Sequence, residues 1–307
     1  MRSHWGRLEF QDQDRLAFLH NQSTNAFKTL QPGQGCETVF VTATARTIDL
    51  ATAYITEDSV LVVVSPHRRQ QLLDWCDRYI FFGDKVKITD VTTSTATFSL
   101  IGPQSAALLN RLGLATLPEM PHSHQLALIN DQPLRLAQGS GLVTPGFTLI
   151  LDQAHAADLW QTLTEQGACP LGEQVWQQLR IRQGRPQPES ELTEDYNPLE
   201  VGLWQSISFD KGCYIGQETI ARLNTYQGVK QRLWGVQLSQ GVDPGTVMRV
   251  ADQKVGLLTS CVATPQGWFG LGYVKTKAGG AGTEVSLADQ RGQLLDLPFV
   301  THPLPSP

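Results

Sequence analysis

Hydrophobic and polar positions in the first part of the chain alternate between helical and extended patterns. Asp12 to Leu19 begins with acidic residues and carries apolar residues for a core, which predicts a short helix. Val39 to Ile55 and Val60 to Val64 are rich in β-branched residues and predict two neighbouring strands. From Ser65 to Ile80 the apolar residues recur at helical spacing, and Gly83 ends the predicted helix. We therefore expect a sheet with helices beside it.

The middle of the chain continues this alternation. Further strands are predicted at 85–88, 96–101 and 147–151, and further helices at 103–112, 154–163 and 172–182. Residues 113–146 are rich in Pro and Gly and predict short, irregular pieces. Arg185 to Asn197 is a long polar loop, and loops of this kind often carry functional residues.

The pattern changes after Gly228. Short β-like pieces at 233–238, 254–262 and 269–274 are separated by Gly and Pro, as in a small barrel or sandwich. We therefore place a domain boundary there. It separates a larger α+β region at residues 1–228 from a C-terminal β module at residues 229–307.

Composition and charge limit the possible partners. The 307 residues are 41% hydrophobic, with 24 basic and 29 acidic side chains and a formal net charge of -5. Such a chain can bury a substantial core, and its overall charge does not attract nucleic acid, so direct nucleic-acid binding is not expected. No apolar run approaches the ~20 residues that span a bilayer, so no membrane contact is expected.

The cysteines and the start of the chain indicate a reducing compartment. The 5 cysteines form no CxxC pair, and the first residues lack the apolar core of a secretory signal. We therefore expect reduced thiols in the cytoplasm or in the interior of an organelle. His122 and His124 alone are a weak metal candidate, so no metal site is predicted. The common dinucleotide, P-loop, zinc-protease and hydrolase motifs are absent from the sequence.

The densest group of chemically notable residues lies near position 213. This motif consists of Lys211, Gly212, Cys213, Tyr214, Ile215, Gly216, Gln217 and Glu218. Its two glycines predict a tight turn, and a helix can begin at Gln217 with its N-terminal amides directed back toward the turn. These amides and the ammonium of Lys211 would favour the thiolate of Cys213, which would make it reactive. The alternative is a buried cysteine that packs as a small apolar side chain.

The motif also carries a family resemblance. Residues 192–223, LTEDYNPLEVGLWQSISFDKGCYIGQETIARL, resemble the hallmark segment of the YgfZ-type folate-binding proteins, relatives of the glycine-cleavage T-protein, an aminomethyltransferase. Residues 18–25, 99–103 and 170–191 resemble other segments of that family in the same order. The resemblance implies an α+β fold arranged as a ring of three modules. Two interleaved α/β modules would lie within residues 1–228, and a small C-terminal β-barrel would follow.

The resemblance further implies a tetrahydrofolate site. Counted from Gly184, Glu191 corresponds to the acidic residue that holds the pterin ring in the T-protein, and a carboxylate suits the paired donors of that ring. Asn25 matches a Thr-Asn turn of the family, and Arg222 matches basic residues near the folate tail. Without the resemblance, these three residues would be a loop charge, a helix cap and a surface arginine.

Asp49 marks a departure from the T-protein. The T-protein has two adjacent acidic residues on this strand, and one of them assists attack on the aminomethyl substrate. This chain has only Asp49, which two registers match to either member of the pair. The departure disfavours aminomethyl transfer and leaves folate binding in place, with Asp49 helping to shape the pocket.

The implied function is a tetrahydrofolate-binding factor that supports assembly or repair of iron–sulfur clusters in client proteins, including tRNA-modifying enzymes. Cys213 would be its essential thiol, and iron–sulfur client or assembly proteins would be its partners. One alternative is a folate-dependent one-carbon transferase with Asp49 as its catalytic group. Another is a scaffold that retains the fold without a ligand and holds a partner protein.

Overall fold

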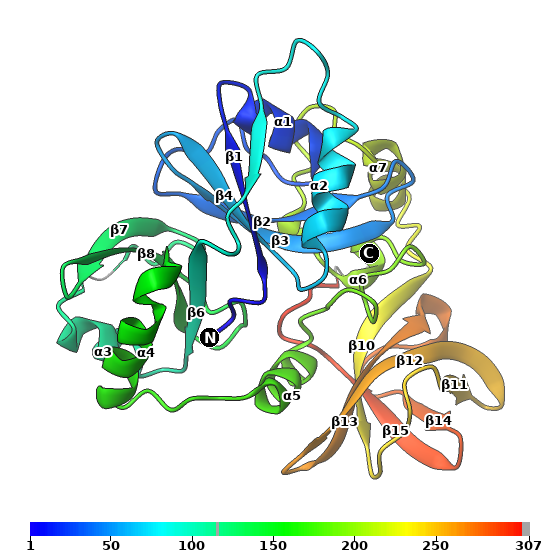
Figure 1. Ribbon diagram of the computed structural model, residues 1–307. Coiled ribbons are helices and arrows are strands. Elements are labelled where there is room, and N and C mark those ends of the chain that lie inside the picture. Colours follow the sequence, from blue (N-terminus) through cyan, green and yellow to red (C-terminus); the bar gives the residue numbers. More distant parts are fainter. Residues whose placement is uncertain (115–116, 303–307) are drawn as a thin grey trace. The chain divides into compact units, whose positions relative to one another are not determined.

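The computed structural model describes residues 1–114 and 117–302 (Figure 1). The chain forms two compact units, and each is assembled from segments that are distant in sequence. The first unit comprises Met1–Phe40, Asp49–Pro170 and Asp210–Tyr214. The second comprises Val41–Ile48, Leu171–Phe209 and Ile215–Pro307. The motif at 211–218 therefore contributes residues to both units.

The first unit holds most of a five-stranded sheet with the strand order β2-β3-β4-β1-β5. The strands are β1 (Gly6–Gln11), β2 (Gly35–Val41), β3 (Thr47–Ile55), β4 (Ser59–Val64) and β5 (Lys87–Asp90). The apolar pattern did not predict β1, which pairs antiparallel with both β4 and β5. Two helices, α1 (Arg15–Gln22) and α2 (Arg69–Asp77), belong to the same unit. Phe40 of β2 and Trp75 of α2 pack edge to face, with ring centroids 5.8 Å apart.

One strand prediction in this sheet was wrong in its extent. Val39 to Ile55 is divided between β2 and β3, because the chain turns where the backbone N–H of Thr42 donates to the carbonyl of Arg46, at 2.9 Å. Ala45 lies in this turn with a left-handed φ of 61°. β-branched composition identified the strands but carried no signal for a turn between them.

The first unit also contains a four-stranded sheet with the order β6-β9-β8-β7. Its strands are β6 (Thr95–Ile101), β7 (His124–Ile129), β8 (Gln132–Gln138) and β9 (Gly146–Asp152). The helices α3 (Ser105–Arg111) and α4 (Ala156–Glu165) accompany this sheet, and a short 3-10 turn, η1 (Gln153–His155), precedes α4. Buried side chains of the sheet and of both helices form one hydrophobic cluster that includes Phe98, Leu149 and Leu159.

Residues 113–146 contain more regular structure than the sequence predicted. β7 and β8 form an antiparallel hairpin in which Ile129 faces Gln132. The two residues between them, Asn130 and Asp131, have left-handed φ angles of 50° and 61°, as a tight two-residue hairpin turn requires. This Asn-Asp pair was the local signal of the hairpin. Residues 115–116 of the same stretch lie outside the described residues.

In the second unit, six strands form a closed barrel with the order β10-β13-β12-β11-β14-β15. They are β10 (Gln231–Leu238), β11 (Val247–Val250), β12 (Gln253–Thr264), β13 (Gly267–Lys275), β14 (Glu284–Leu287) and β15 (Gln290–Leu295), with a 3-10 turn η3 (Thr276–Ala278) after β13. Trp234, Leu258 and Val274 belong to the core of the barrel. The C-terminal barrel expected from the sequence is confirmed. The domain boundary near Gly228 stays a prediction, and the compact unit that contains the barrel also includes residues before it.

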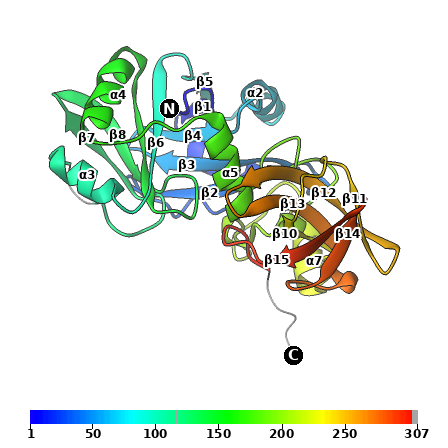
Figure 2. The same cartoon turned by 90° about the horizontal axis from the view of Figure 1, so that it is seen from below.

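The helices of the second unit are α5 (Glu173–Gln183), α6 (Pro198–Val201) and α7 (Gln217–Thr225), and a 3-10 turn, η2 (Trp204–Ser206), follows α6. α5 lies against β12 and β13 (Figure 2), and Gln178 of α5 donates to the carbonyl of Ala263 at 2.9 Å. α5 ends at Gly184, whose φ of 83° suits glycine. A side chain at this position would also collide with Leu297, 2.6 Å from the added Cβ.

No helix in the described ranges is both long and apolar enough to cross a bilayer. All six helices predicted from the sequence are present, with ends shifted by a few residues. The largest shift is at the start of α2, because His67 adopts a left-handed φ of 64° and delays the helix to Arg69.

Candidate functional site

Lys211 is buried in the first unit, and its ammonium donates to three backbone carbonyls. Nζ lies 2.5 Å from the oxygen of His20, 2.6 Å from that of Ser23 and 2.7 Å from that of Asn25. These oxygens lie at the end of α1 and in the turn after it, where helix carbonyls lack partners within the helix. The ring of Tyr214 lies 4.4 Å from the same Nζ. Lys211 therefore ties the motif to the turn that carries Asn25.

Burial opposes the charge of Lys211, whereas the three carbonyl acceptors and the ring of Tyr214 favour its ammonium form. Burial lowers the pKa of Lys211 to about 7. Burial likewise lowers the pKa of His20, and the nearby positive charge of Lys211 acts in the same direction. His20 Nδ1 accepts the backbone N–H of Phe27, at 3.2 Å, which fits a neutral imidazole with an acceptor at that nitrogen.

Asn25 is anchored to β2 by its own amides. Its backbone N–H donates to Thr38 Oγ1 at 3.0 Å, and its side-chain Nδ2 donates to the carbonyl of Glu37 at 2.8 Å. Its Oδ1 accepts the backbone N–H of Ala26, at 2.8 Å. The turn expected at Asn25 is thus present and held from two sides, by β2 and by Lys211.

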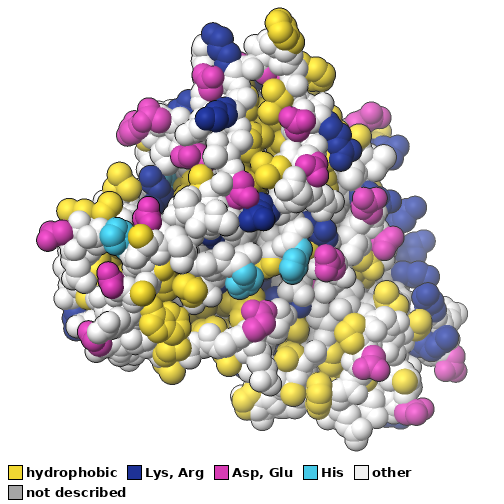
Figure 3. All heavy atoms as spheres, in the orientation of Figure 1, with side chains coloured by type: hydrophobic (Ala, Val, Ile, Leu, Met, Phe, Trp, Pro, Cys, Tyr) yellow, Lys and Arg dark blue, Asp and Glu magenta, His cyan; other side chains and the backbone are white. Residues whose placement is uncertain are grey.

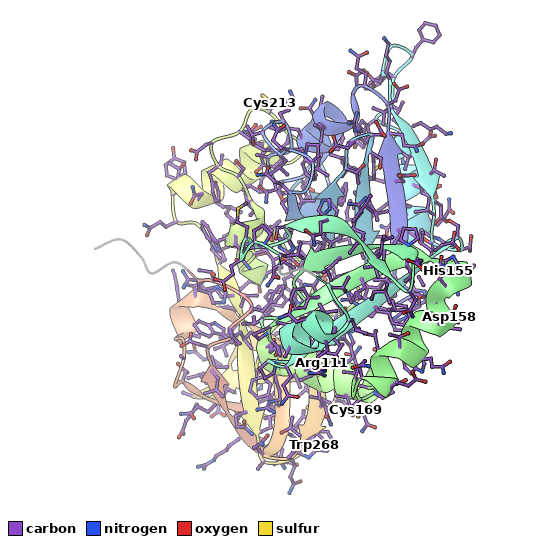
Figure 4. All side chains as sticks on the ribbon, turned by 90° about the vertical axis from the view of Figure 1, so that its left-hand side faces the viewer. Arg111, His155, Asp158, Cys169, Cys213 and Trp268 are labelled. Carbon is purple, nitrogen blue, oxygen red and sulfur yellow. The ribbon has the colours of Figure 1, made fainter. Side chains whose placement is uncertain are left out.

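Cys213 is exposed, so it is not the buried packing cysteine of the alternative interpretation. Figure 4 shows it on a loop of the first unit, far from the exposed Cys169. Two further thiols of this unit are less exposed, since Cys36 is half-buried and Cys76 is buried. Burial raises the pKa of Cys36 and of Cys76 to about 12, which keeps both in the thiol form. The ammonium of Lys211, which the sequence predicts to favour the Cys213 thiolate, donates instead to three backbone carbonyls.

The two glycines of the motif have different roles. Gly216 precedes α7 with a φ of 79°, and an added Cβ would lie 2.9 Å from the carbonyl oxygen of Thr42 and 3.1 Å from Val41. Gly212 has no atom within 4 Å of an added Cβ. Only Gly216 is therefore required by sterics. The helix predicted to begin at Gln217 is confirmed.

The remaining polar residues of this segment lie on α7. Glu218 lies in the first turn and Arg222 in the last, an arrangement that complements the helix dipole. Arg222 is exposed. Further exposed basic residues follow where β10 begins and β13 ends, including Lys230, Lys275 and Lys277. Figure 3 shows Lys and Arg side chains gathered along the right-hand edge of the face drawn.

Glu191 lies in the second unit with its carboxylate completely buried. One oxygen accepts the hydroxyls of Ser260, at 2.6 Å, and Thr259, at 2.7 Å. The other accepts Arg180 Nη1 at 3.1 Å and the backbone N–H of Gln187 at 3.2 Å. Four donors therefore already surround the carboxylate that the sequence assigned to the pterin ring.

The pair formed by Arg180 and Glu191 connects α5, the polar loop and the barrel. Arg180 also donates from Nη2 to Ser260 Oγ on β12, at 3.2 Å. Burial lowers the pKa of Arg180, and the charge of Glu191 opposes this effect. The hydroxyl of the fully buried Tyr273 donates to the backbone carbonyl of Glu191 at 2.7 Å, and Tyr196 stacks on Tyr273 with ring centroids 3.5 Å apart.

Glu200 is a second buried carboxylate near this loop and is not among the site residues predicted from the sequence. It completes a capping box at the start of α6, where its Oε2 accepts the backbone N–H of Asn197 at 3.1 Å. Arg46 Nη1 lies 3.9 Å from the same oxygen. Burial raises the pKa of Glu200. The local signal was the sequence Asn197-Pro198-Leu199-Glu200, a capping pattern that has no link to ligand binding.

Asp49 lies on β3 and is completely buried. Its Oδ2 accepts the backbone N–H of Ser65, at 2.8 Å, just after β4 ends. Its neighbours Ile48 and Leu50 are buried as well, so both faces of the strand are covered at this point.

The predicted site residues divide between the two units. The first unit contains Asn25, Asp49, Lys211, Gly212, Cys213 and Tyr214, and the second contains Glu191, Gly216, Gln217, Glu218 and Arg222. Within the first unit, the structure brings Asn25, Lys211 and Tyr214 together. The roles of these residues toward a folate stay predictions.

Comparison with known proteins defines the family. The model of the GCVT N-terminal domain matches residues 2–211, about two thirds of the chain. A provisionally named chloroplastic transferase of Arabidopsis thaliana is 45% identical over 307 residues, which cover 99% of this chain and 71% of the relative. The protein described here belongs to the glycine-cleavage T-protein family.

More distant relatives extend over almost the same length. An aminomethyltransferase of Shouchella clausii is 28% identical and covers 98% of this chain and 84% of its own. One from Synechococcus elongatus is 27% identical, with 98% and 83% covered. The crystal structure of the glycine cleavage system aminomethyltransferase T from Bartonella henselae matches with a TM-score of 0.84 at 20% identity and covers 98% of this chain and 85% of that one. This last match supports the fold.

Proposed function

We propose that the protein binds a reduced folate of the tetrahydrofolate type. The observation that carries this proposal is family membership along nearly the whole chain, since relatives named aminomethyltransferases match 98% of it. The closed C-terminal barrel and two sheets with helices are present in the described residues, and this supports the proposal. Titration with tetrahydrofolate, followed by intrinsic tryptophan fluorescence, tests the proposal.

Two carboxylates are candidate acceptors for the paired N–H donors on the edge of the pterin ring. Glu191 is the residue that the sequence assigned, and a pterin would have to replace the hydroxyls of Thr259 and Ser260 that now donate to it. Glu200 has fewer tight donors, and burial raises its pKa, as is common at functional carboxylates. Both therefore enter the proposal as candidate pterin acceptors.

Matched variants separate the two candidates. Glu191→Gln and Glu200→Gln are compared with Glu194→Gln, an exposed glutamate of the same loop. Loss of the pterin acceptor is expected to weaken folate binding at least about tenfold, because the lost hydrogen bond involves a charged group. Glu194→Gln should bind like the wild type. If neither buried variant weakens binding while both remain folded, the pterin edge is held by other groups.

We further propose that Cys213 is the essential thiol of a factor that supports iron–sulfur cluster assembly or repair, as the YgfZ-type resemblance implies. Its exposure supports a reaction or a contact with a client protein. The test is activity of iron–sulfur enzymes in a bacterial strain that lacks its own YgfZ-type protein. Cys213→Ser should fail to restore activity, whereas Cys169→Ser, at the other exposed thiol, should restore it. Full restoration by Cys213→Ser contradicts this role.

A folate-dependent one-carbon transferase is the second candidate, and the names of the relatives favour it. Asp49 would be the polar catalytic group, although its carboxylate is buried and accepts the N–H of Ser65. Turnover of a methylamine-type donor with tetrahydrofolate would establish this activity. Asp49→Asn should abolish it and the exposed Asp58→Asn should not. Absence of turnover with every donor tested removes this candidate.

A further inference from the structure

The ammonium of Lys211 joins two segments that lie 186 to 191 residues apart in the sequence. We propose that Lys211 is a positioning residue that holds the Asn25 turn and the Cys213 loop as one body, so that a ligand bound at the turn changes the reactivity of the Cys213 thiol. The binding of a reduced folate at the turn rests on the proposed function and on the match of Asn25 to the family resemblance. The connection through Lys211 rests on hydrogen bonds within the first unit.

The geometry gives Lys211 a structural role toward Cys213. An ammonium has three N–H donors, and three carbonyl oxygens lie within 2.5 to 2.7 Å of Nζ. All three donors are therefore used, and none remains for the thiol two residues further along. Tyr214, which follows Cys213 in the sequence, places its ring against the same ammonium. Cys213 is thus flanked by two residues that are fixed at the same point.

The Asn25 turn is connected rigidly to that point. Its carbonyl accepts from Lys211, while its N–H and side-chain amide hold Thr38 and Glu37 of β2. A displacement of the turn must therefore be transmitted to Nζ or break a charge-assisted hydrogen bond. Because coupling between two sites is reciprocal, a change at the Cys213 loop must also affect ligand binding at the turn.

The test compares Lys211→Met with Lys28→Met. Methionine keeps an unbranched side chain that is one atom shorter and removes all three donors. Lys28 is exposed and contributes positive charge to the same surroundings, so its variant controls for charge alone. The readouts are the rate of Cys213 alkylation by N-ethylmaleimide, measured on peptides by mass spectrometry, and hydrogen exchange of residues 20–26. The exposed Cys169 is the internal reference for the reagent.

Without ligand, Lys211→Met should change the ratio of Cys213 to Cys169 alkylation about fivefold or more, in the range typical of coupled sites. It should also increase hydrogen exchange in residues 20–26. Lys28→Met should match the wild type in both readouts. Unchanged alkylation and exchange in folded Lys211→Met would overturn the positioning role. If Lys211→Met does not fold, Lys211→Gln, which keeps one amide donor group, replaces it under the same criteria.

With saturating 5-formyltetrahydrofolate, the alkylation ratio should shift in the wild type and in Lys28→Met, and the shift should be lost in Lys211→Met. A shift of equal size in Lys211→Met overturns the coupling. A wild-type protein that binds no reduced folate overturns the proposed function and the coupling to folate together. The ligand-free comparison then still decides whether Lys211 positions the Cys213 loop.

Discussion

Glu191 and Lys211 are both buried charged groups, and they differ in the partners that compensate their charge. Glu191 faces the guanidinium of Arg180 and also accepts two hydroxyls and a backbone N–H, so an opposite charge and neutral donors share its two oxygens. Lys211 is held by three backbone carbonyls and an aromatic ring, which are all neutral. Burial accordingly lowers the pKa of Lys211 to about 7.

This difference in partners indicates that Glu191 and Lys211 have different structural roles. A buried ion pair with additional hydrogen bonds fixes its surroundings, and removal of one partner leaves the other uncompensated. Glu191 therefore fastens α5 and the polar loop to the barrel. A buried ammonium that has only neutral acceptors and no opposite charge has a lowered pKa, and it can lose its proton near neutral pH. Lys211 therefore connects two segments through hydrogen bonds that depend on pH.

The largest effect is expected from Glu191→Ala, which leaves the guanidinium of Arg180 buried without its carboxylate. The free energy of unfolding should fall by about 3–5 kcal/mol, measured by urea unfolding with circular dichroism. The exposed Glu194→Ala is the control and should stay within about 0.5 kcal/mol of the wild type. A loss below about 1 kcal/mol for Glu191→Ala would show that the pair does not stabilise the unit as described.

A smaller loss is expected at the second glycine of the motif. Gly216→Ala must hold a left-handed φ and approach the carbonyl of Thr42, so the free energy of unfolding should fall by at least about 1–2 kcal/mol. Gly212→Ala meets no atom and should change stability by less than about 0.5 kcal/mol. Equal effects in urea unfolding at the two positions would contradict the difference in their backbone surroundings.

The pH dependence of stability separates the two regions. Lys211 has a pKa of about 7 when folded and an ordinary value of 10.5 when unfolded, so between these pH values the unfolded chain binds more protons. Stability of the wild type relative to Lys211→Met should therefore rise with pH from 7 to 10.5, by up to about 1.4 kcal/mol per pH unit. Urea midpoints at several pH values measure this difference. A difference that is constant with pH would mean that Lys211 keeps its ordinary pKa.

The smallest expected effect is that of Tyr273→Phe. It removes the hydroxyl that donates to the carbonyl of Glu191 and keeps the ring stacked on Tyr196, so the loss should be about 1 kcal/mol. Tyr226→Phe, at an exposed ring, is the control and should leave the thermal midpoint unchanged. A loss as large as that of Glu191→Ala would place the main anchor of the loop at Tyr273 instead.

The sequence predicted the elements whose signal is local. Helical spacing identified the helices, and the glycines and prolines after Gly228 indicated the barrel. The sequence did not predict β1, whose partners β4 and β5 are distant in the chain, or the β7–β8 hairpin, whose Asn-Asp turn lay in a Pro- and Gly-rich stretch. The pairing of β1 depends on contacts that no local pattern contains, whereas the hairpin had a local turn signal among the surrounding Pro and Gly residues.

The candidate site was predicted as a set of residues but without their partners. The resemblance identified Glu191 and Lys211 as notable. No spacing in the sequence could show that the hydroxyls of Ser260 and Thr259, on a distant strand, donate to the Glu191 carboxylate. Likewise, the carbonyls that bind Lys211 belong to a turn almost 190 residues away, and a carbonyl is present at every position of the chain. Only the folded chain shows which of them converge.

The most direct test of the central claim is calorimetric titration of the full chain with tetrahydrofolate under reducing conditions. The account predicts one saturable site, weakened by loss of the pterin-binding carboxylate and retained in Cys213→Ser. Absence of heat and of competition with any reduced folate, for a protein that unfolds cooperatively, would contradict it. The chain would then be a member of the T-protein family that retains the fold without the folate.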